Sequence, residues 1–243
     1  MTYRTIFVCL ALLNFGPGSA GWSNRASGSK IISYVVDPHK QDIRFFWKNE
    51  SGALFGNIGN LRQYFERRHR KLIFAMNGGM FKSDYSPVGL FIQDGQVVNA
   101  LDTSSGAGNF YLKPNGVFYL TSAGKAGICP TGDFAGGNGI RYATQSGPML
   151  LVDGHIHPAF RQGSANLNIR NGVGLLPDNR IIFAMSEEPI NFYNFADFFK
   201  SQGCRNALYL DGFVSKTYLP DEKCEQTDGN LGVIIGVSTA DTQ

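Results

Sequence analysis

The pattern of apolar and polar positions along this chain predicts a protein built mainly from strands. Short apolar runs alternate with turn-forming dipeptides, which is typical of antiparallel hairpins. Hairpins are expected at residues 88–100, 109–121, 149–157 and 173–185, with turns at Asp94-Gly95, Asn115-Gly116, Asp153-Gly154 and Asp178-Asn179. Further strands are expected at residues 30–36, 42–47, 71–76, 207–210 and 231–237.

Two segments instead have the spacing of amphipathic helices. Apolar residues recur every three to four positions in residues 56–70 and again in residues 191–202, where Gly203 follows as a helix-ending residue. The chain is therefore expected to have an α+β fold, with a mixed, largely antiparallel sheet built from hairpins and a few helices. Because no internal repeat or linker interrupts the pattern, residues 30–243 are expected to form a single domain.

The N-terminus has the composition of a secretion signal. Arg4 precedes an apolar run at residues 6–15, and Gly18-Ser19-Ala20 forms a small-residue cleavage site. Residues 1–20 are interpreted as a signal peptide and residues 21–29 as a flexible lead-in. The apolar run is too short to span a bilayer, and no other stretch is long enough. We therefore expect an exported protein, periplasmic or secreted, with no membrane span.

Composition and charge narrow the choice of partners. Hydrophobic residues make up 43% of the 243 residues and charged residues 17%, which is ordinary for a chain with a sizeable core. The net charge is only +3, and the one basic run, at residues 67–71, ends a predicted helix, where cations complement the helix dipole. We therefore expect no nucleic-acid partner. The sequence does not indicate an oligomeric state.

Three cysteines lie beyond the predicted signal peptide: Cys129, Cys204 and Cys224. An oxidising compartment favours a disulfide between two of them. The preferred pair is Cys204 with Cys224, because this bond would hold the loop after Asp211. A bond from Cys129 to either of the other two stays open.

Five short polar motifs adjoin predicted strands. Asn77-Gly78-Gly79 follows one strand, and glycines there let the backbone approach a ligand. Asp211 follows another strand, with Ser215 shortly after it. Arg170 lies on a loop entering a strand, and an arginine can bind an anion through two parallel hydrogen bonds. The remaining motifs are Ser86-Pro87-Val88-Gly89 and Gln145-Ser146-Gly147-Pro148. Taken singly, each motif is equally consistent with a turn or loop.

Metal and nucleotide sites have weaker support. His155 and His157 alternate along a predicted strand and so share a face, but no third ligand lies near them in the sequence. The chain contains no C-x-x-C, P-loop, G-x-S-x-G or dinucleotide-binding motif. The sequence therefore indicates no cofactor and no metal ligands, and it leaves a divalent metal open.

Together the five motifs resemble those of the phosphodiester glycosidase family, over about residues 71–237. The resemblance is carried by A-M-N-G-G-M-F at 75–81, P-V-G-L at 87–90, Q-S-G-P-M-L at 145–150, N-I-R-N-G-V-G at 168–174 and N-A-L-Y-L-D-G at 206–212. It implies an active site whose catalytic residues are Asp211, Arg170, Asn77 and Ser215. It implies substrate-binding residues at Gly78, Gly79, Phe81, Gln145, Gly147 and Gly212.

One motif departs from the family pattern. Where the family usually has Asp-Gly-Gly-Gly-Ser, this chain has Asp211-Gly212-Phe213-Val214-Ser215. The spacing of the aspartate and serine is kept, but two small residues have become bulky. Phe213 and Val214 are therefore expected to narrow or reshape the substrate pocket.

The resemblance implies an exported hydrolase that cleaves a sugar-1-phosphodiester or a related glycan–phosphate linkage of the cell envelope. The leaving group is then a phosphate monoester, whose remaining ionisation has a pKa of about 6, so it departs without a strong general acid. One carboxylate and an anion clamp would suffice. Asp211 suits the carboxylate. Arg170 suits the clamp, assisted by the backbone N–H groups of Gly78 and Gly79.

Two other functions stay open at this point. The chain could be a non-catalytic exported protein that binds carbohydrate or an envelope polymer, which the bulky Phe213-Val214 pair would favour. It could also be a phosphodiesterase that breaks the P–O bond rather than the C–O bond. In every case the partner is a phosphorylated sugar or an envelope glycan.

Overall fold

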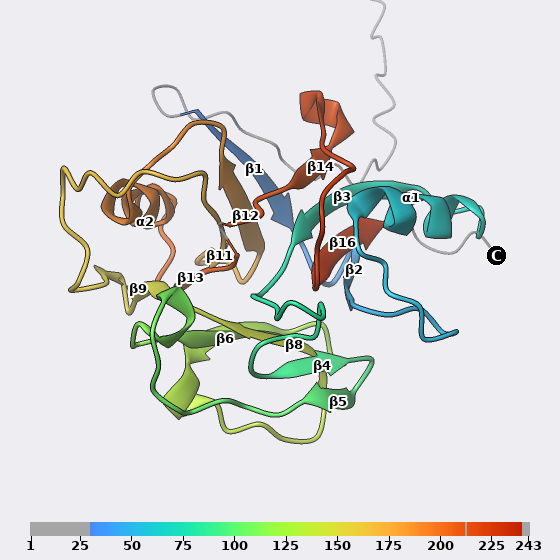
Figure 1. The fold of residues 1–243 in the computed structure, drawn as a ribbon, viewed down its shortest axis with the longest axis horizontal. Coiled ribbons are helices and arrows are strands. Elements are labelled where there is room, and N and C mark those ends of the chain that lie inside the picture. The colour runs from blue at the N-terminus through green and yellow to red at the C-terminus, as the bar shows by residue number, and fades with distance from the viewer. Residues whose placement is uncertain (1–29, 212, 240–243) are drawn as a thin grey trace, which may run out of the picture.

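Antiparallel sheets form most of the protein. The computed structural model describes residues 30–211 and 213–239 (Figure 1). In this part of the chain the strands form three sheets, all strand pairs are antiparallel, and two α-helices are present. The predicted α+β class is correct, with sheet as the dominant component.

The first sheet has six strands in the order β1-β12-β11-β13-β9-β10. Their bounds are Ile31–Val36 (β1), Ile181–Ser186 (β12), Asn171–Leu175 (β11), Ala207–Tyr209 (β13), Met149–Val152 (β9) and His155–Ile156 (β10). The second sheet has the order β15-β14-β3-β16-β2. It contains Cys224–Glu225 (β15), Thr217–Leu219 (β14), Leu72–Asn77 (β3), Ile234–Ser238 (β16) and Asp42–Phe46 (β2).

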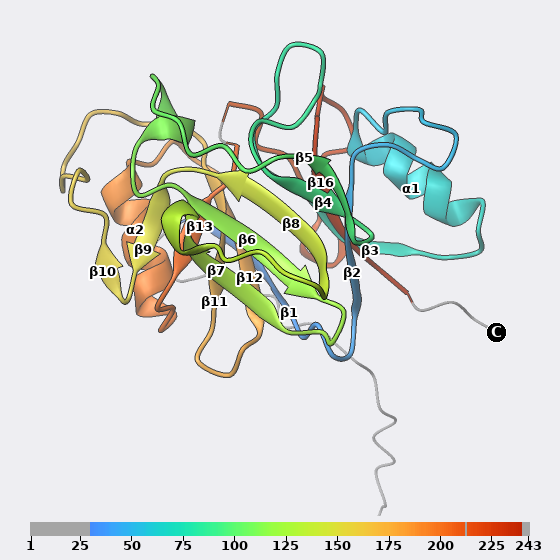
Figure 2. The ribbon, with the colours of Figure 1, turned by 90° about the horizontal axis from the view of Figure 1, so that it is seen from below.

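The third sheet has the order β5-β4-β8-β6-β7; it lies below the other two sheets in Figure 1 and in front of them in Figure 2. Its strands are Gln96–Asn99 (β5), Phe91–Gln93 (β4), Ile140–Ser146 (β8), Gly116–Thr121 (β6) and Ala126–Pro130 (β7). Short 3-10 helices lie at Asn109–Tyr111 (η1), Thr131–Asp133 (η2) and Pro220–Glu222 (η3).

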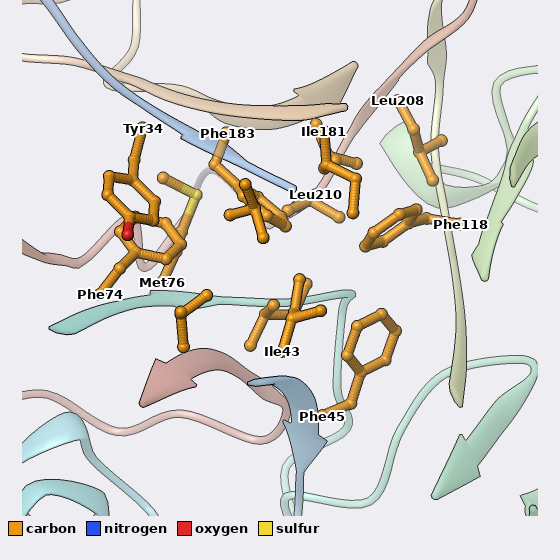
Figure 3. Packing of buried hydrophobic residues seen from close by; sticks show 14 of the residues in the cluster. Tyr34, Ile43, Phe45, Phe74, Met76, Phe118, Ile181, Phe183, Leu208 and Leu210 are labelled. Carbon is orange, nitrogen blue, oxygen red and sulfur yellow. The ribbon is translucent and has the colours of Figure 1, made fainter. Parts of the chain in front are cut away.

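One hydrophobic core lies between the three sheets. Figure 3 shows aromatic and aliphatic side chains from several strands pointing toward one another in this core. Strand β13 lies between this central core and a second hydrophobic cluster. Leu208 and Leu210 point into the central core, whereas Ala207 and Tyr209 belong to a separate cluster beneath the second helix. Both faces of this strand are buried, which explains why its sequence is apolar without a break.

The two helices cover the outer faces of two sheets. Helix α1 (Ile58–Glu66) packs on the second sheet, and α2 (Phe192–Ser201) packs on the first. Each begins with an asparagine cap: Asn57 accepts from Asn60 N at 2.8 Å, and Asn191 accepts from Asn194 N at 2.8 Å. The buried phenylalanines of α2 each contribute about 2 kcal/mol by leaving water. Neither described helix has the length and apolar character needed to cross a bilayer.

Three of the four predicted hairpins are confirmed. The β4–β5, β9–β10 and β11–β12 pairs turn at the expected dipeptides. Asp94, Asp153 and Asn179 have positive φ values of 49°, 48° and 65°, a conformation that Asp and Asn tolerate in tight turns.

The hairpin predicted at residues 109–121 is wrong. Asn115 does not occupy a turn between paired strands: it is buried, its Nδ2 donates to Phe110 O at 2.9 Å, and β6 begins only at Gly116. Strand β6 instead pairs with β7 and β8, two strands that the apolar pattern did not predict. The buried asparagine thus shapes a loop rather than reversing the chain.

The predicted disulfide between Cys204 and Cys224 is also wrong. No disulfide joins the three cysteines that the structure describes. Cys204 is buried in the cluster under α2, whereas Cys224 lies on β15 at the edge of the second sheet, packed against the central core. Cys204 lies in the connection between α2 and β13, whereas Cys224 lies on the second sheet, so the two thiols belong to different parts of the fold.

Candidate active site

The motifs that flank β3, β11 and β13 meet at the ends of these strands. Strands β11 and β13 pair with Gly172 opposite Tyr209, and Leu210 N extends the pairing by donating to Asn171 O at 3.2 Å. After β13 the chain passes to β14, which lies beside β3 (Figure 1). Asn77, at the end of β3, is therefore close to Asn171 and Asp211.

The side chain of Asn77 links three segments. It is 1% exposed, and its Nδ2 donates to Asp211 O at 2.8 Å. Its Oδ1 accepts from Lys216 N at 2.8 Å and from Asn171 Nδ2 at 2.9 Å. Asn77 therefore fixes the backbone on both sides of the loop that carries Asp211, and both ends of its amide bond to the protein.

Asn171 is a buried partner that the sequence interpretation missed. It is fully buried, and its Nδ2 donates to both O and Oδ1 of Asn77, at 3.1 and 2.9 Å. Its own Oδ1 is buried with no hydrogen-bond partner in the described part of the chain. A buried acceptor without a donor is costly, and such groups often mark functional regions. In the sequence, Asn171 stood out only as part of the motif at residues 168–174.

Asp211 is a buried carboxyl group with few interactions to offset the cost of burying its charge. It is 8% exposed, and the only hydrogen bond to its carboxylate among the described residues comes from Phe213 N at 3.2 Å. Burial raises its pKa from 3.8 to about 6, which the Phe213 N–H only partly offsets. No ion pair reaches it from the described residues. Asp211 therefore changes its protonation state near neutral pH, as catalytic carboxyl groups often do.

Ser215 lies on the same loop but points toward a different neighbour. It is half-buried, and its Oγ is 3.5 Å from Ile169 O, at the outer limit for a hydrogen bond. This contact places the loop after Asp211 beside the segment that leads to Arg170. Gly212, the remaining predicted residue of this motif, lies outside the described residues.

Arg170 is buried deeply and held by the protein. It is 1% exposed, its Nε donates to Ile190 O at 2.8 Å, and its Nη2 donates to Asn166 O at 3.0 Å. Its guanidinium lies 3.5 Å from the ring centroid of Phe192 and 5.7 Å from that of Tyr209. Burial lowers the pKa of Arg170, and the Tyr209 hydroxyl opposes this effect. In this geometry the Arg170 guanidinium is not an exposed two-pronged clamp, because its N–H groups bond to the protein.

The glycines after Asn77 serve close packing. Gly78 N donates to Val233 O at 2.8 Å, so this N–H is not available to bind an anion. A side chain at Gly78 would lie 2.6 Å from Val233 Cγ1, and one at Gly79 would lie 2.4 Å from Thr144 Oγ1. The expectation that the Gly78 N–H assists an anion clamp is therefore wrong.

Gln145 holds together the loops that surround the site. It is fully buried, and its Oε1 accepts from Leu90 N and Asp102 N, each at 2.9 Å. Its Nε2 donates to Asp102 O at 2.6 Å. Gly147 packs against Asn115, with only 2.7 Å from an added Cβ to the Asn115 Cβ. The Gln145 amide is thus committed to the loops, and Gly147 allows close packing on Asn115.

The two aromatic positions near the site differ in exposure. Phe81 is half-buried and stacks on Tyr85 with ring centroids 5.7 Å apart. The sequence predicted that Phe213 would narrow or reshape the substrate pocket. Its side chain is instead 97% exposed to solvent. Val214 instead packs against the cluster beneath α1. The departure from the family motif therefore places an aromatic ring in solvent beside Asp211.

The histidine pair does not form a metal site. His155 is exposed, whereas His157 is buried and uses both ring nitrogens: Nδ1 accepts from Ala159 N at 3.1 Å, and Nε2 lies 3.1 Å from Lys113 O. This arrangement requires a neutral ring, and burial lowers the pKa of His157. Within residues 30–211 and 213–239, no three His, Cys, Asp or Glu side chains gather as metal ligands.

Comparison with solved structures first defines the fold. The catalytic domain of zebrafish N-acetylglucosamine-1-phosphodiester alpha-N-acetylglucosaminidase, auto-inhibited by its pro-peptide, superposes with a TM-score of 0.60 and 16% identity, covering 90% of this chain and 86% of that chain. A hypothetical protein from Synechocystis superposes with a TM-score of 0.55 and 14% identity, covering 90% of this chain and 61% of that chain. At these identities the comparison shows a shared fold.

Comparison of sequences then defines the family. Residues 70–237 match the phosphodiester glycosidase family. The chain is also 36% identical over 221 residues to YigE, an uncharacterized protein of Escherichia coli strain K12, covering 90% of this chain and 86% of that protein. The chain therefore belongs to the phosphodiester glycosidase family, as its five motifs predicted.

Proposed function

We propose that this protein is an exported hydrolase that cleaves the bond between a sugar and phosphate in a sugar-1-phosphodiester. The observation that carries this proposal is the Asp211 carboxyl group, which is buried, has no cation bonded to it among the described residues and has a pKa raised to about 6. Family membership supplies the class of linkage. Export rests on the signal-like composition of residues 1–20.

The chemistry needs only one carboxylate. As the C–O bond breaks, positive charge develops on the sugar, and the Asp211 carboxylate stabilises it or takes a proton from the attacking water. The phosphate leaves with the bonding electron pair, and water supplies the oxygen of the new sugar hydroxyl. Asn77 acts on Asp211 through the backbone, because its Nδ2 binds Asp211 O.

Hydrolysis in ¹⁸O-labelled water tests the proposal directly. The purified protein without residues 1–20 is incubated with a panel of sugar-1-phosphodiesters, with and without a divalent metal ion. We expect the label in the free sugar. Label in the phosphate would instead show a phosphodiesterase that breaks the P–O bond, and the absence of any product would favour a non-catalytic binding protein. Equal turnover by the Asp211→Asn variant would overturn the assignment of the carboxylate.

A further inference from the structure

Phe213 is the most exposed large hydrophobic side chain in the described part of the chain. Its exposed fraction is 97%, and the next most exposed such side chain, Val97, reaches 65%. Burying a phenylalanine ring is strongly favourable, so a ring that stays in solvent contributes nothing of this kind to folding. The stability of the folded chain therefore does not explain the aromatic residue at position 213.

The backbone of Phe213 is bonded to the carboxyl group of the candidate active site. Its N–H donates to Asp211 Oδ1 at 3.2 Å. Asn77 holds both ends of this short segment, through hydrogen bonds of 2.8 Å to Asp211 O and 2.8 Å to Lys216 N. The ring is therefore attached at a fixed place close to the Asp211 carboxylate.

The residues on either side leave this ring facing outward. Asp211 is buried, and Val214 packs against the cluster beneath α1. Phe213 lies between these two enclosed side chains and takes the outward direction. The next residues in the chain, Ser215 and Lys216, are polar. The segment thus presents one aromatic ring among polar groups rather than a continuous apolar surface.

A single aromatic ring with polar neighbours is suited to a pyranose. The C–H groups on one face of a sugar ring can pack on an aromatic face, while the hydroxyl groups at its rim bond to water and to polar groups. A lipid surface or a protein partner would instead require a broader apolar patch. Because the Phe213 N–H bonds to the Asp211 carboxylate, a sugar stacked on the ring would lie next to that carboxylate.

We propose that the Phe213 ring is the surface on which the pyranose of the substrate stacks, and that it fixes the orientation of this sugar beside Asp211. The inference rests on the proposed function for its substrate, a sugar-1-phosphodiester. Phe213 is then a specificity-determining residue that binds the sugar, while Asp211 carries the chemistry. These roles can be separated by substitution, because the N–H bond to Asp211 belongs to the backbone and does not need the ring.

The kinetics of three variants test this role. Phe213→Ala should raise KM for a sugar-1-phosphodiester by about tenfold and leave kcat within about twofold, because loss of the stacking contact weakens substrate binding. Phe213→Leu, which restores apolar surface without a ring, should recover little of this loss. Phe213→Trp should stay within about twofold of the wild type. The rise of activity with pH through about 6 should persist in all three variants, since the N–H bond to Asp211 remains.

NMR spectroscopy tests the stacking without requiring turnover. The purified protein with isotope-labelled phenylalanine is titrated with methyl α-glucoside and with methyl N-acetyl-α-glucosaminide. Glycerol serves as a polyol without a pyranose ring. We expect the Phe213 signals, assigned by their absence from the Phe213→Leu spectrum, to shift saturably with at least one glycoside and not with glycerol. Phosphatidylcholine vesicles should leave these signals unchanged.

The matched control is Val97→Ala, which removes another exposed apolar side chain, on β5 of the third sheet. It should leave KM and kcat unchanged. A KM that does not depend on Phe213, an equal rise in KM for Val97→Ala, or Phe213 signals that neither glycoside shifts would each overturn the inference. Binding to vesicles instead of glycosides would overturn it as well, by showing a ring that contacts lipid. If a glycoside shifts the Phe213 signals but no sugar-1-phosphodiester is cleaved, the stacking surface stands and the proposed hydrolysis fails.

Discussion

Two regions of the protein bury an arginine and an aspartate, and they treat these charges differently. In the paired cluster, defined as Arg70, Asp42, Arg44 and Ser238, the guanidinium of Arg70 binds Asp42 and also donates to Ser238 Oγ at 2.7 Å. Burial raises the pKa of Asp42, but hydrogen bonds from Arg44 and Arg70 outweigh it and the net pKa is lowered.

In the unpaired cluster, defined as Arg170, Asp211, Asn77 and Asn171, neither charged side chain forms an ion pair among the described residues. Arg170 is satisfied by carbonyl and amide oxygens, and the pKa of Asp211 is raised to about 6. The ion pairs of the paired cluster thus stabilise the folded protein, whereas the buried, unpaired charge of Asp211 destabilises it. This contrast separates a structural carboxylate from a candidate catalytic one more clearly than burial does, since both are mostly enclosed.

The largest expected effect comes from Asp211→Asn. Removing the carboxylate should lower kcat/KM on a sugar-1-phosphodiester by roughly a thousandfold, as for other catalytic acid–base groups. Stability should change in the opposite direction. A pKa raised from 3.8 to about 6 in the folded state penalises folding fully above pH 6 and not at all below pH 3.8. Urea unfolding should therefore show the variant more stable by about 3 kcal/mol at pH 7.

The pH dependence of the same variant provides the control. Its stability advantage should disappear at about pH 4, and wild-type activity should rise with pH through about 6 as the carboxylate forms. If the variant is less stable than the wild type at pH 7, the buried Asp211 carboxylate must have interactions that offset the cost of its burial, and the interpretation is wrong.

The next largest effect is expected for Asn77→Ala. This change leaves Asp211 O and Lys216 N without their side-chain partner and Asn171 Nδ2 with only the backbone oxygen of residue 77, at a cost of about 3 kcal/mol in the free energy of unfolding. Activity should fall as well, because the backbone of Asp211 loses its anchor. Denaturant unfolding and kcat/KM measure the two effects.

Asn115→Ala is the matched control for this change, because it removes a buried asparagine whose side chain makes one hydrogen bond among the described residues, to Phe110 O. It should cost only about 1 kcal/mol. Equal losses for the two variants would show that Asn77 has no special role as a link.

A smaller effect is expected in the paired cluster. Asp42→Asn leaves Arg70 with a weaker partner and should lower stability by about 2 kcal/mol at pH 7, after allowance for the partial exposure of Asp42. Because the folded-state pKa of Asp42 is lowered, its contribution is present above pH 3.8 and is lost as pH falls through the folded-state pKa. The two proteins should converge in stability at low pH, while kcat/KM stays within about twofold. A large loss of activity would remove the distinction between the clusters.

The smallest effect is expected from a reducing agent. The described cysteines form no disulfide, so reduction should change stability by less than about 0.5 kcal/mol. Burial raises the pKa of Cys204 to about 12 and that of Cys129 to about 11, so both thiols should react slowly with an alkylating agent at pH 8. A clear decrease in melting temperature on reduction would show that a disulfide does form.

The sequence predicted where strands end, and therefore where the site lies, because apolar runs followed by Asn77-Gly78 and Asp211-Gly212 are local signals. It did not predict what each polar group contacts. Gly78 N binds Val233 O and Asn171 binds Asn77, contacts between residues far apart in the chain that only the sheet order brings together. A hollow lined by Asn109, Phe160 and Phe192 could not be predicted from the sequence either, because its walls come from η1, a loop and α2.

Asn77 has a consequence for how this site could diversify. Its amide holds Asp211 O with one end and Lys216 N with the other, so a single side chain closes a small ring around the segment between them. Residues inside that ring, such as the exposed Phe213, can be exchanged or lengthened while the carboxyl group keeps its place. With Asp211 as the reactive carboxylate of the proposed function, substrate selectivity and the catalytic group would be separable parts of this scaffold.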